Sequence, residues 1–162
     1  MPLPVEGAQY LRTHQANDTI ELQQHGLRLG IWGEWQSLAS TFQIVVHNSD
    51  ETSARLDFEG VRFYWENDQV RITYFKVNGT FYPLDRRDYF YRRRIEEAGS
   101  EKQYRQSIQV LIPGMSEQVL KITFTGRIWK EYDEKLLFTL EIPFLIGQEK
   151  AVFKIPFRRS GD

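Results

Sequence analysis

Apolar and polar side chains alternate along most of the chain, which is the period of a β-strand with one buried face. Phe42, Ile44 and Val46 show this spacing clearly. Further alternating stretches predict strands at residues 19–24, 27–35, 107–112, 120–128, 138–144 and 153–158. No long helical period occurs, so we predict an all-β fold in which about nine or ten strands form two packed antiparallel sheets, a β-sandwich. A closed barrel is the alternative.

Two hairpins are predicted in the middle of the chain. The Asn-Gly pair at residues 78–79 lies between FKV and TFY and favours a type I′ turn, because both central residues of that turn need positive φ. A second turn at residues 67–68 gives apolar partners on one face, and residues 59–60 then mark a bulge or corner. This register pairs Trp65 with Val70, Phe63 with Ile72 and Val61 with Tyr74.

The last two strands form a hairpin across the loop GQEK, which pairs residue 146 with residue 151. Each of these strands carries a proline, Pro143 or Pro156. Proline cannot donate a ladder hydrogen bond and is found mainly at sheet edges and bulges. We therefore expect residues 151–158 near the edge of a sheet.

The segment TFQIVVHNSDETSARLDFEGVRFYW contains an apolar strand, an Asn-Ser-Asp turn and a second pair of strands. With its surroundings, roughly residues 20–84, it resembles the opening of immunoglobulin-like accessory domains of bacterial and stress-related proteins. The resemblance implies an immunoglobulin-like β-sandwich. The disulfide and core-tryptophan spacing of antibody domains is missing, since the chain has no cysteine. We assign residues 19–162 to one domain and expect residues 1–18 to be a flexible segment.

Residues 85–97, DRRDYFYRRRIEE, concentrate five arginines around three aromatic residues. A helix is one interpretation, with Asp85 as its cap and Gly99 at its end. A strand over residues 87–95 is the other interpretation. We favour the strand, because Tyr104, Ile108 and Val110 need a neighbouring strand.

Charges of both signs interleave in this arginine segment, and residues 85–105 hold seven basic and five acidic side chains. We interpret the segment as solvated and internally paired, for example through Arg93 and Glu97 on a helix. An anion or nucleotide pocket is the alternative. Binding of nucleic acid is disfavoured by the interleaved carboxylates and by the net charge of −1 for the whole chain. The candidate ligand-binding residues here are Arg86, Arg87, Arg92, Arg93 and Arg94.

The stretch LDRRDYFYRR also resembles the arginine-rich segment of PilZ domains, which are β-barrels that bind a cyclic dinucleotide. The resemblance covers about ten residues. It implies that Arg86, Arg87 and Arg92 grip phosphates and guanine edges. The second half of the family's motif, an Asp or Asn followed by Ser and Gly after a strand, has no counterpart downstream.

Three tryptophans are candidates for stacking on sugar rings. Trp32 and Trp35 flank Gly33, and Trp129 has the outward parity of its strand. We interpret these residues mainly as parts of the core or covers of its open ends, and carbohydrate binding is the alternative.

Candidate catalytic residues are few. The chain has no cysteine and no HExxH, GxSxG, P-loop or dinucleotide-binding motif. Its three histidines stand apart from one another in the sequence: His14, His25 and His47. An acidic group between two predicted strands is interpreted as a hairpin loop and consists of Glu131, Asp133 and Glu134. We therefore predict a protein that is not an enzyme and holds no metal or cofactor.

These features together predict a non-catalytic interaction or accessory domain that presents a surface to another protein. No apolar stretch is long enough to span a membrane, and no signal-peptide pattern occurs. Localisation is left open between the bacterial cytoplasm and the bacterial envelope, where a signal or an anchor would have been removed from the sequence.

Overall fold

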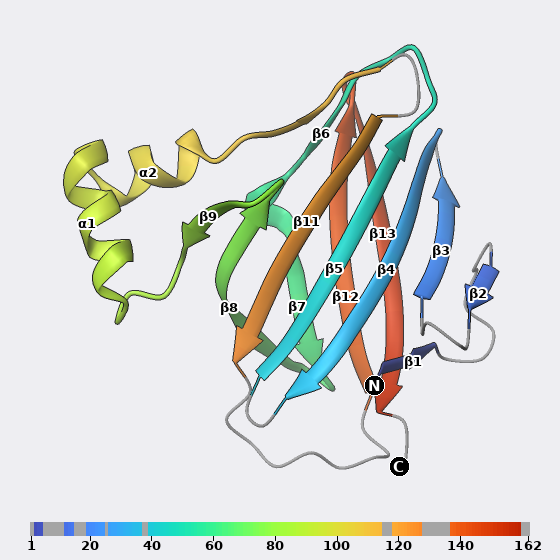
Figure 1. The fold of residues 1–162 in the computed structure, drawn as a ribbon, viewed down its shortest axis with the longest axis horizontal. Coiled ribbons are helices and arrows are strands. Elements are labelled where there is room, and N and C mark those ends of the chain that lie inside the picture. Colours follow the sequence, from blue (N-terminus) through green and yellow to red (C-terminus); the bar gives the residue numbers. More distant parts are fainter. Residues whose placement is uncertain are drawn as a thin grey trace.

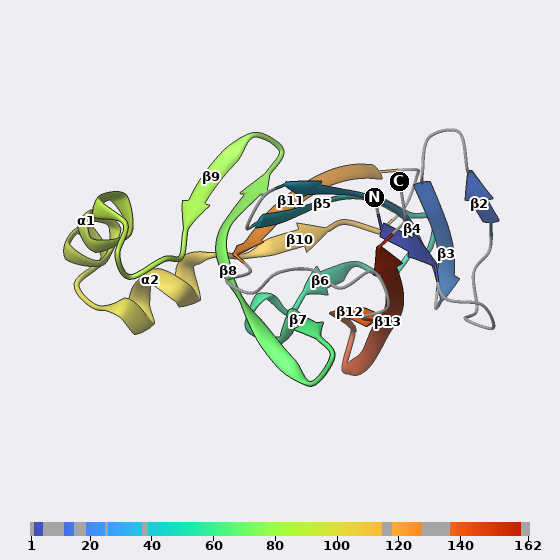
Figure 2. The ribbon, with the colours of Figure 1, turned by 90° about the horizontal axis from the view of Figure 1, so that it is seen from below.

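The computed structural model describes residues 2–4, 12–14, 19–24, 26–36, 39–114, 118–127 and 137–159. Within these ranges the chain forms thirteen strands, two α-helices and one 3-10 turn (Figure 1). All strand pairs are antiparallel, and the strands make two layers, with both helices at one end of the sandwich (Figure 2). The predicted fold class is confirmed as a β-sandwich of two antiparallel sheets, and its immunoglobulin-like character stays a prediction.

The first sheet is built around β12 (Leu137–Ile146). One side of β12 pairs with β13 (Glu149–Arg159), and β13 pairs in turn with β1 (Pro2–Pro4). The other side of β12 pairs with β7 (Arg62–Trp65) and with β6 (Ala54–Leu56). The short strand β10 (Val110–Ile112) extends the sheet beyond β6.

The second sheet packs over the first. Its strands, in spatial order, are β9 (Thr80–Pro83), β8 (Asp68–Val77), β11 (Gln118–Arg127), β5 (Ala39–Asn48), β4 (Leu27–Gln36), β3 (Thr19–Gln24) and β2 (Arg12–His14). Four of the thirteen strands, β1, β2, β6 and β10, have only three residues each. Such short strands leave little periodic signal in a sequence.

Strand β8 belongs to both sheets. Its residues 68–70 pair with β7 of the first sheet, whereas residues 71–77 pair with β11 of the second. Ile72 and Tyr74 of β8 pair with consecutive residues of β11, so Thr73 is an extra residue, a β-bulge. A bulge bends its strand, which helps β8 to pass from one layer to the other. Along its other edge, β8 pairs with β7 before this bend and with β9 after it.

The alternating positions predicted to face inward form the core. In β5, Phe42, Ile44 and Val46 are buried. The same alternation buries residues of β4, β12 and β13: Leu27, Leu29, Ile31, Leu140, Ile142, Phe144, Phe153 and Ile155. The side chains of residues 115–138 lie outside the described part of the chain, so the predicted inward positions of β11 and that of Phe138 stay predictions.

The hairpin predicted at the Asn-Gly pair is confirmed. Val77 pairs with Thr80, and the two residues between them both have positive φ, 48° at Asn78 and 89° at Gly79. The corner expected at residues 59–60 is also present, as the 3-10 turn Phe58–Gly60.

Two other predicted registers are wrong, each by two residues. Trp65 pairs with Asp68 instead of Val70, and Ile146 pairs with Glu149 instead of residue 151. Each loop is therefore two residues long instead of four. A shift of two residues keeps every side chain on its own face, so the alternation of apolar and polar residues fits both registers equally well.

The expectation that residues 151–158 lie near a sheet edge is confirmed. Strand β13 pairs with β12 along ten residues, whereas its other side pairs, within the described part of the chain, with the three residues of β1 alone. Strands β1 and β2 lie within residues 1–18, which we expected to be flexible. The flexibility of that segment and the single-domain boundary at residue 19 stay predictions.

The strand preferred for residues 87–95 is wrong, because this segment is α1 (Tyr89–Ala98), followed by α2 (Glu101–Ser107). Asp88, rather than Asp85, caps α1 by accepting a hydrogen bond from the backbone N–H of Phe90 at 2.8 Å. Gly99 ends the helix with a φ of 99°, as the helical interpretation expected.

One face of α1 packs on the rest of the molecule. Tyr91 is fully buried, and Ile95 and Ala98 are partly buried against the core. Their spacing of four and three residues is that of one helix face, which explains why packing favours a helix here. No helix in the described ranges is both long and apolar enough to cross a membrane.

Candidate functional site

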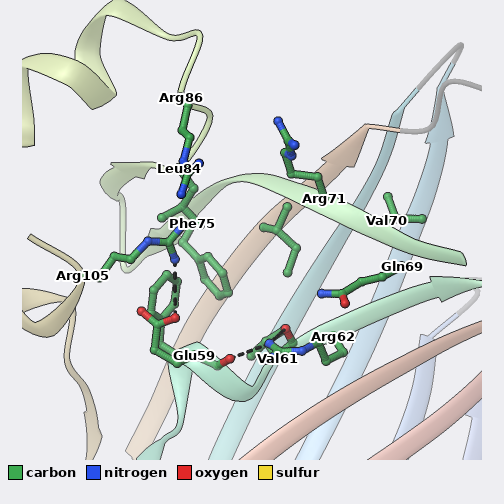
Figure 3. A pocket seen from close by; sticks show the side chains of 12 residues that line it. Glu59, Val61, Arg62, Gln69, Val70, Arg71, Phe75, Leu84, Arg86 and Arg105 are labelled. Atoms are coloured by element: carbon green, nitrogen blue, oxygen red, sulfur yellow. Dashed lines mark hydrogen bonds and ion pairs between the residues drawn. The ribbon is translucent and has the colours of Figure 1, made fainter. Parts of the chain in front are cut away.

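A cavity of about 500 Å³ opens where β8 leaves β7 and is joined by β9 (Figure 3). Its walls come from β7, β8, α2, the 3-10 turn and the segment after β9. The lining residues are Phe58, Glu59, Val61, Arg62, Gln69, Val70, Arg71, Ile72, Phe75, Leu84, Arg86 and Arg105. We call this cavity the arginine corner, after Arg62, Arg71, Arg86 and Arg105.

The apolar part of the lining is an opening onto the sandwich core. Phe58 and Phe75 are buried and pack edge to face, with 4.8 Å between their ring centroids. Val70 and Leu84 are also buried, while Ile72 is partly buried. The corner can therefore offer an apolar contact beside its charges.

The four arginines come from four separate elements. Arg62 lies on β7 and Arg71 on β8, one position beyond the last paired residues Phe63 and Val70 of that hairpin. Arg86 lies between β9 and α1, and Arg105 lies on α2. Among the described residues, the lining thus contains four guanidinium groups and one carboxylate, that of Glu59.

Glu101 on α2 holds two of these arginines next to each other. Its Oε1 atom lies 3.3 Å from Nη2 of Arg86 and 3.6 Å from Nε of Arg105. The hydroxyl of Tyr91 donates a hydrogen bond to the same oxygen at 2.7 Å. Because both arginines contact one oxygen atom, their guanidinium groups are close neighbours at the corner.

The ionisation of this network follows from its contacts. The hydrogen bond from Tyr91 lowers the pKa of Glu101, and the charges of Arg86 and Arg105 lower it further. Burial raises the pKa of Tyr91. Burial alone would lower the pKa of Arg105, but contacts with Tyr91, Glu59 and Glu101 outweigh it, so the net shift is upward. Glu101 and Arg105 are therefore charged at neutral pH, and Tyr91 is neutral.

Glu59 contacts Arg105 through a different nitrogen from the one that Glu101 contacts. Its Oε2 atom lies 3.5 Å from Nη1 of Arg105 (Figure 3). The backbone carbonyl of Glu59 accepts a hydrogen bond from Nη1 of Arg62, and the same nitrogen donates to the carbonyl of Val61 at 2.9 Å. The 3-10 turn is thereby attached to one arginine of the corner through its backbone and to another through a side chain.

Helix α2 is fixed to the sandwich by Tyr104. The hydroxyl of Tyr104 donates to the carbonyl of Pro83 at 2.9 Å, and both residues are buried. The rings of Tyr104 and Tyr91 pack edge to face, with 5.7 Å between their centroids. Burial raises the pKa of Tyr104 to about 12. These contacts determine where Arg105 lies relative to the sheets.

The five arginines predicted as ligand-binding residues do not form one site. Arg86 lines the corner, and Arg87 forms an ion pair with Asp85, with 3.5 Å between Nε and Oδ1. The other three lie exposed on α1: Arg92, Arg93 and Arg94. Arg93 pairs with Glu97 at 3.6 Å, as the helical interpretation expected. Internal pairing thus describes much of the segment, and whether any of these five residues binds a ligand stays a prediction.

Sequence reasoning missed Arg62, Arg71 and Arg105. Arg62 and Arg71 alternate with the apolar residues of the hairpin predicted around residues 67–68, so a shared polar face was a signal that they are neighbours. Nothing in the alternation pattern connected that hairpin to Arg86 or Arg105, because the connection depends on the position of α2.

The tryptophan and histidine candidates are only partly described. Trp32 is half-buried on β4, opposite Gln43 of β5, and His47 is half-buried on β5. The remaining predicted side chains lie outside the described part of the chain: Trp35, Trp129, His14, His25, Glu131, Asp133 and Glu134. Carbohydrate binding stays a prediction. Among the described residues, no group of three or more His, Asp or Glu side chains is placed to hold a metal ion.

Comparison with known proteins gives only distant structural likenesses. No protein-family model matches the chain, and no curated protein matches its sequence. The PilZ resemblance therefore has no support from these comparisons. The GAE domain of GGA2p from Saccharomyces cerevisiae has 10% sequence identity and a TM-score of 0.41, covering 88% of this chain and 97% of that one. The yeast GGA1 GAE domain has 7% identity and a TM-score of 0.37, covering 85% and 95%. Neither function nor partner is carried over from likenesses at this level.

Proposed function

We propose that this chain is a non-catalytic interaction domain that binds an acidic segment of a partner protein at the arginine corner. The observation that carries the proposal is the composition of one cavity: four guanidinium groups, one carboxylate and an apolar wall. A chain with a net charge near zero has no general attraction for polyanions. Four guanidinium groups against the carboxylates of Glu59 and Glu101 leave a local positive excess, which favours a specific acidic partner.

The chemistry of the lining fits a short acidic peptide segment. Guanidinium groups present parallel N–H donors that match the two oxygens of a carboxylate. Ile72, which is only partly buried, can contact an apolar side chain next to the acidic residues. An interface that combines arginines with a desolvated apolar anchor is typical of tight protein recognition.

The corner also holds two of its arginines, Arg62 and Arg105, in defined positions. Arg105 is only 31% exposed and is contacted by Glu101 and Glu59. Arg62 is held by hydrogen bonds to two backbone carbonyls. Side chains that are ordered before binding lose less conformational entropy on binding, which favours the corner over the exposed arginines of α1.

The test is binding of a fluorescein-labelled peptide, GSEELEELGS, measured by fluorescence anisotropy at low and high salt. The control peptide, GSQQLQQLGS, has glutamine in place of each glutamate. We expect saturable binding of the acidic peptide, weaker binding at high salt because exposed charges are screened beyond about 10 Å at 0.1 M salt, and no binding of the glutamine peptide.

Two surface variants locate the site. Arg71→Gln and Arg86→Gln should each weaken binding by about two- to fivefold, the range expected for one exposed ion pair. Arg92→Gln removes the same charge from α1, outside the corner, and should leave the affinity unchanged. Failure of the acidic peptide to bind would refute the proposal, and equal losses in all three variants would show that only net charge matters.

A further inference from the structure

We infer that Glu59 occupies the place of the partner's carboxylate in the free protein, and that binding displaces it from Arg105. This inference rests on the proposed function of the arginine corner. The group of the partner that Arg105 binds is a side-chain carboxylate, and Glu59 lowers the affinity of the corner for that carboxylate.

The first argument is geometric. Glu59 supplies the only carboxylate among the described residues that line the corner, and its Oε2 atom lies 3.5 Å from Nη1 of Arg105. Arg105 uses its other edge for Glu101, with 3.6 Å between Nε and Oε1. A ligand carboxylate at the mouth of the corner would need the donor that Glu59 now occupies. Glu59 therefore shows that this position accepts a carboxylate.

The second argument concerns which carboxylate can leave. The Glu59 side chain is 59% exposed, whereas that of Glu101 is 37% exposed. Glu101 Oε1 is also held by Arg86 and by the hydroxyl of Tyr91. An exposed ion pair contributes little stability, because water replaces it readily. Glu59 is thus the exchangeable partner of Arg105, and Glu101 is the permanent one.

The third argument is that the exchange needs no change in the fold. The turn that carries Glu59 is fixed by backbone hydrogen bonds: Asp57 N–H donates to Pro143 O at 2.9 Å, and Gly60 N–H donates to Asp57 O at 3.0 Å. Arg62 holds the backbone carbonyl of Glu59. Only the exposed side chain has to rotate toward solvent.

The experiment compares Glu59→Gln with a matched control, Glu96→Gln, in the anisotropy assay with GSEELEELGS. Both substitutions remove one negative charge, and Glu96 lies exposed on α1 outside the corner. We expect Glu59→Gln to bind the peptide about two- to fivefold more tightly than the native chain, which is the range for releasing one exposed ion pair. We expect Glu96→Gln to match the native chain. Circular dichroism spectra and melting temperatures check that both variants are folded.

The outcomes separate this inference from the proposed function. If the native chain binds the peptide and Glu59→Gln binds it no more tightly than Glu96→Gln does, displacement is refuted while the acidic-segment site stands. Weaker binding by Glu59→Gln would also refute displacement, because Glu59 would then support the site. If the native chain does not bind the peptide, the proposed function and this inference fail together, whether or not Glu59→Gln binds it.

Discussion

Helices α1 and α2, which we call the helical lobe, should be held in position by the hydroxyl group of Tyr104. Tyr104→Phe removes the donor that contacts Pro83 O at 2.9 Å and leaves that carbonyl buried without this partner. The ring itself stays, so its packing against Tyr91 is preserved. The substitution therefore tests a single hydrogen bond between α2 and β9, the strand that borders the arginine corner.

The expected loss follows from the burial of both groups. A neutral hydrogen bond contributes about 1 kcal/mol to stability, and a buried acceptor left without a partner adds to the cost. We therefore expect Tyr104→Phe to lower the free energy of unfolding by about 1–2 kcal/mol. For a chain of this length, each kcal/mol lowers the melting temperature by about 2–4 °C, which gives a decrease of about 2–8 °C. The matched control is Tyr89→Phe on α1, since the Tyr89 side chain is 60% exposed and should contribute little.

The assay is urea unfolding at pH 7, followed by far-ultraviolet circular dichroism and by intrinsic fluorescence. Coincident transitions from the two probes would justify a single free energy of unfolding. If Tyr104→Phe were as stable as Tyr89→Phe, the hydroxyl would not fix the lobe, and the argument that α2 presents Arg105 at a defined position would fail.

Two further predictions concern the same lobe. Burial raises the pKa of Tyr104 to about 12 from an ordinary value of 10.0, so its neutral form stabilises the fold fully below pH 10, and this contribution is lost as the pH rises from 10 to about 12. The free energy of unfolding in urea should therefore fall less steeply between these pH values in Tyr104→Phe than in the native chain. Parallel declines of the two free energies would contradict the burial of this group. Asp88→Ala removes the cap of α1 and should lower the free energy of unfolding by about 1 kcal/mol, whereas Asp88→Asn should lower it little. Equal stabilities of the two variants in urea unfolding would contradict the capping role of Asp88.

The alternation of side chains predicted which residues are buried more reliably than which residues are paired. Phe42, Ile44 and Val46 are buried as expected, because a strand with one apolar face can be oriented in only one way. Two hairpin registers differ by two residues from their predicted positions, since such a shift conserves the face of every side chain. Only the Asn-Gly turn carried local chemistry specific enough to determine its register.

The helical lobe was not predictable from local preference alone. Tyr89, Phe90 and Tyr91 have side chains that favour strands, and the strand was preferred because Tyr104, Ile108 and Val110 need a neighbouring strand. The helix forms because Asp88 caps it and because Tyr91 is buried. Tertiary packing thus overrode local preference.

The candidate site depends on that lobe. Arg62 and Arg71 lie together through a predicted hairpin, but Arg86 and Arg105 join them only because Glu101 holds both and Tyr104 docks α2 on Pro83. Contacts between residues so far apart in sequence leave no periodic signal. The arginine cluster was visible in the sequence, whereas its division between the corner and α1 was not.

The central claim, that the arginine corner receives acidic side chains, is tested most directly by nuclear magnetic resonance of the arginine Nε–Hε groups during titration with GSEELEELGS. The claim predicts saturable shifts for Arg86 and Arg105, with Arg92 and Arg94 unchanged. Shifts confined to the arginines of α1, or no shift at any arginine when the peptide is in excess, would contradict it.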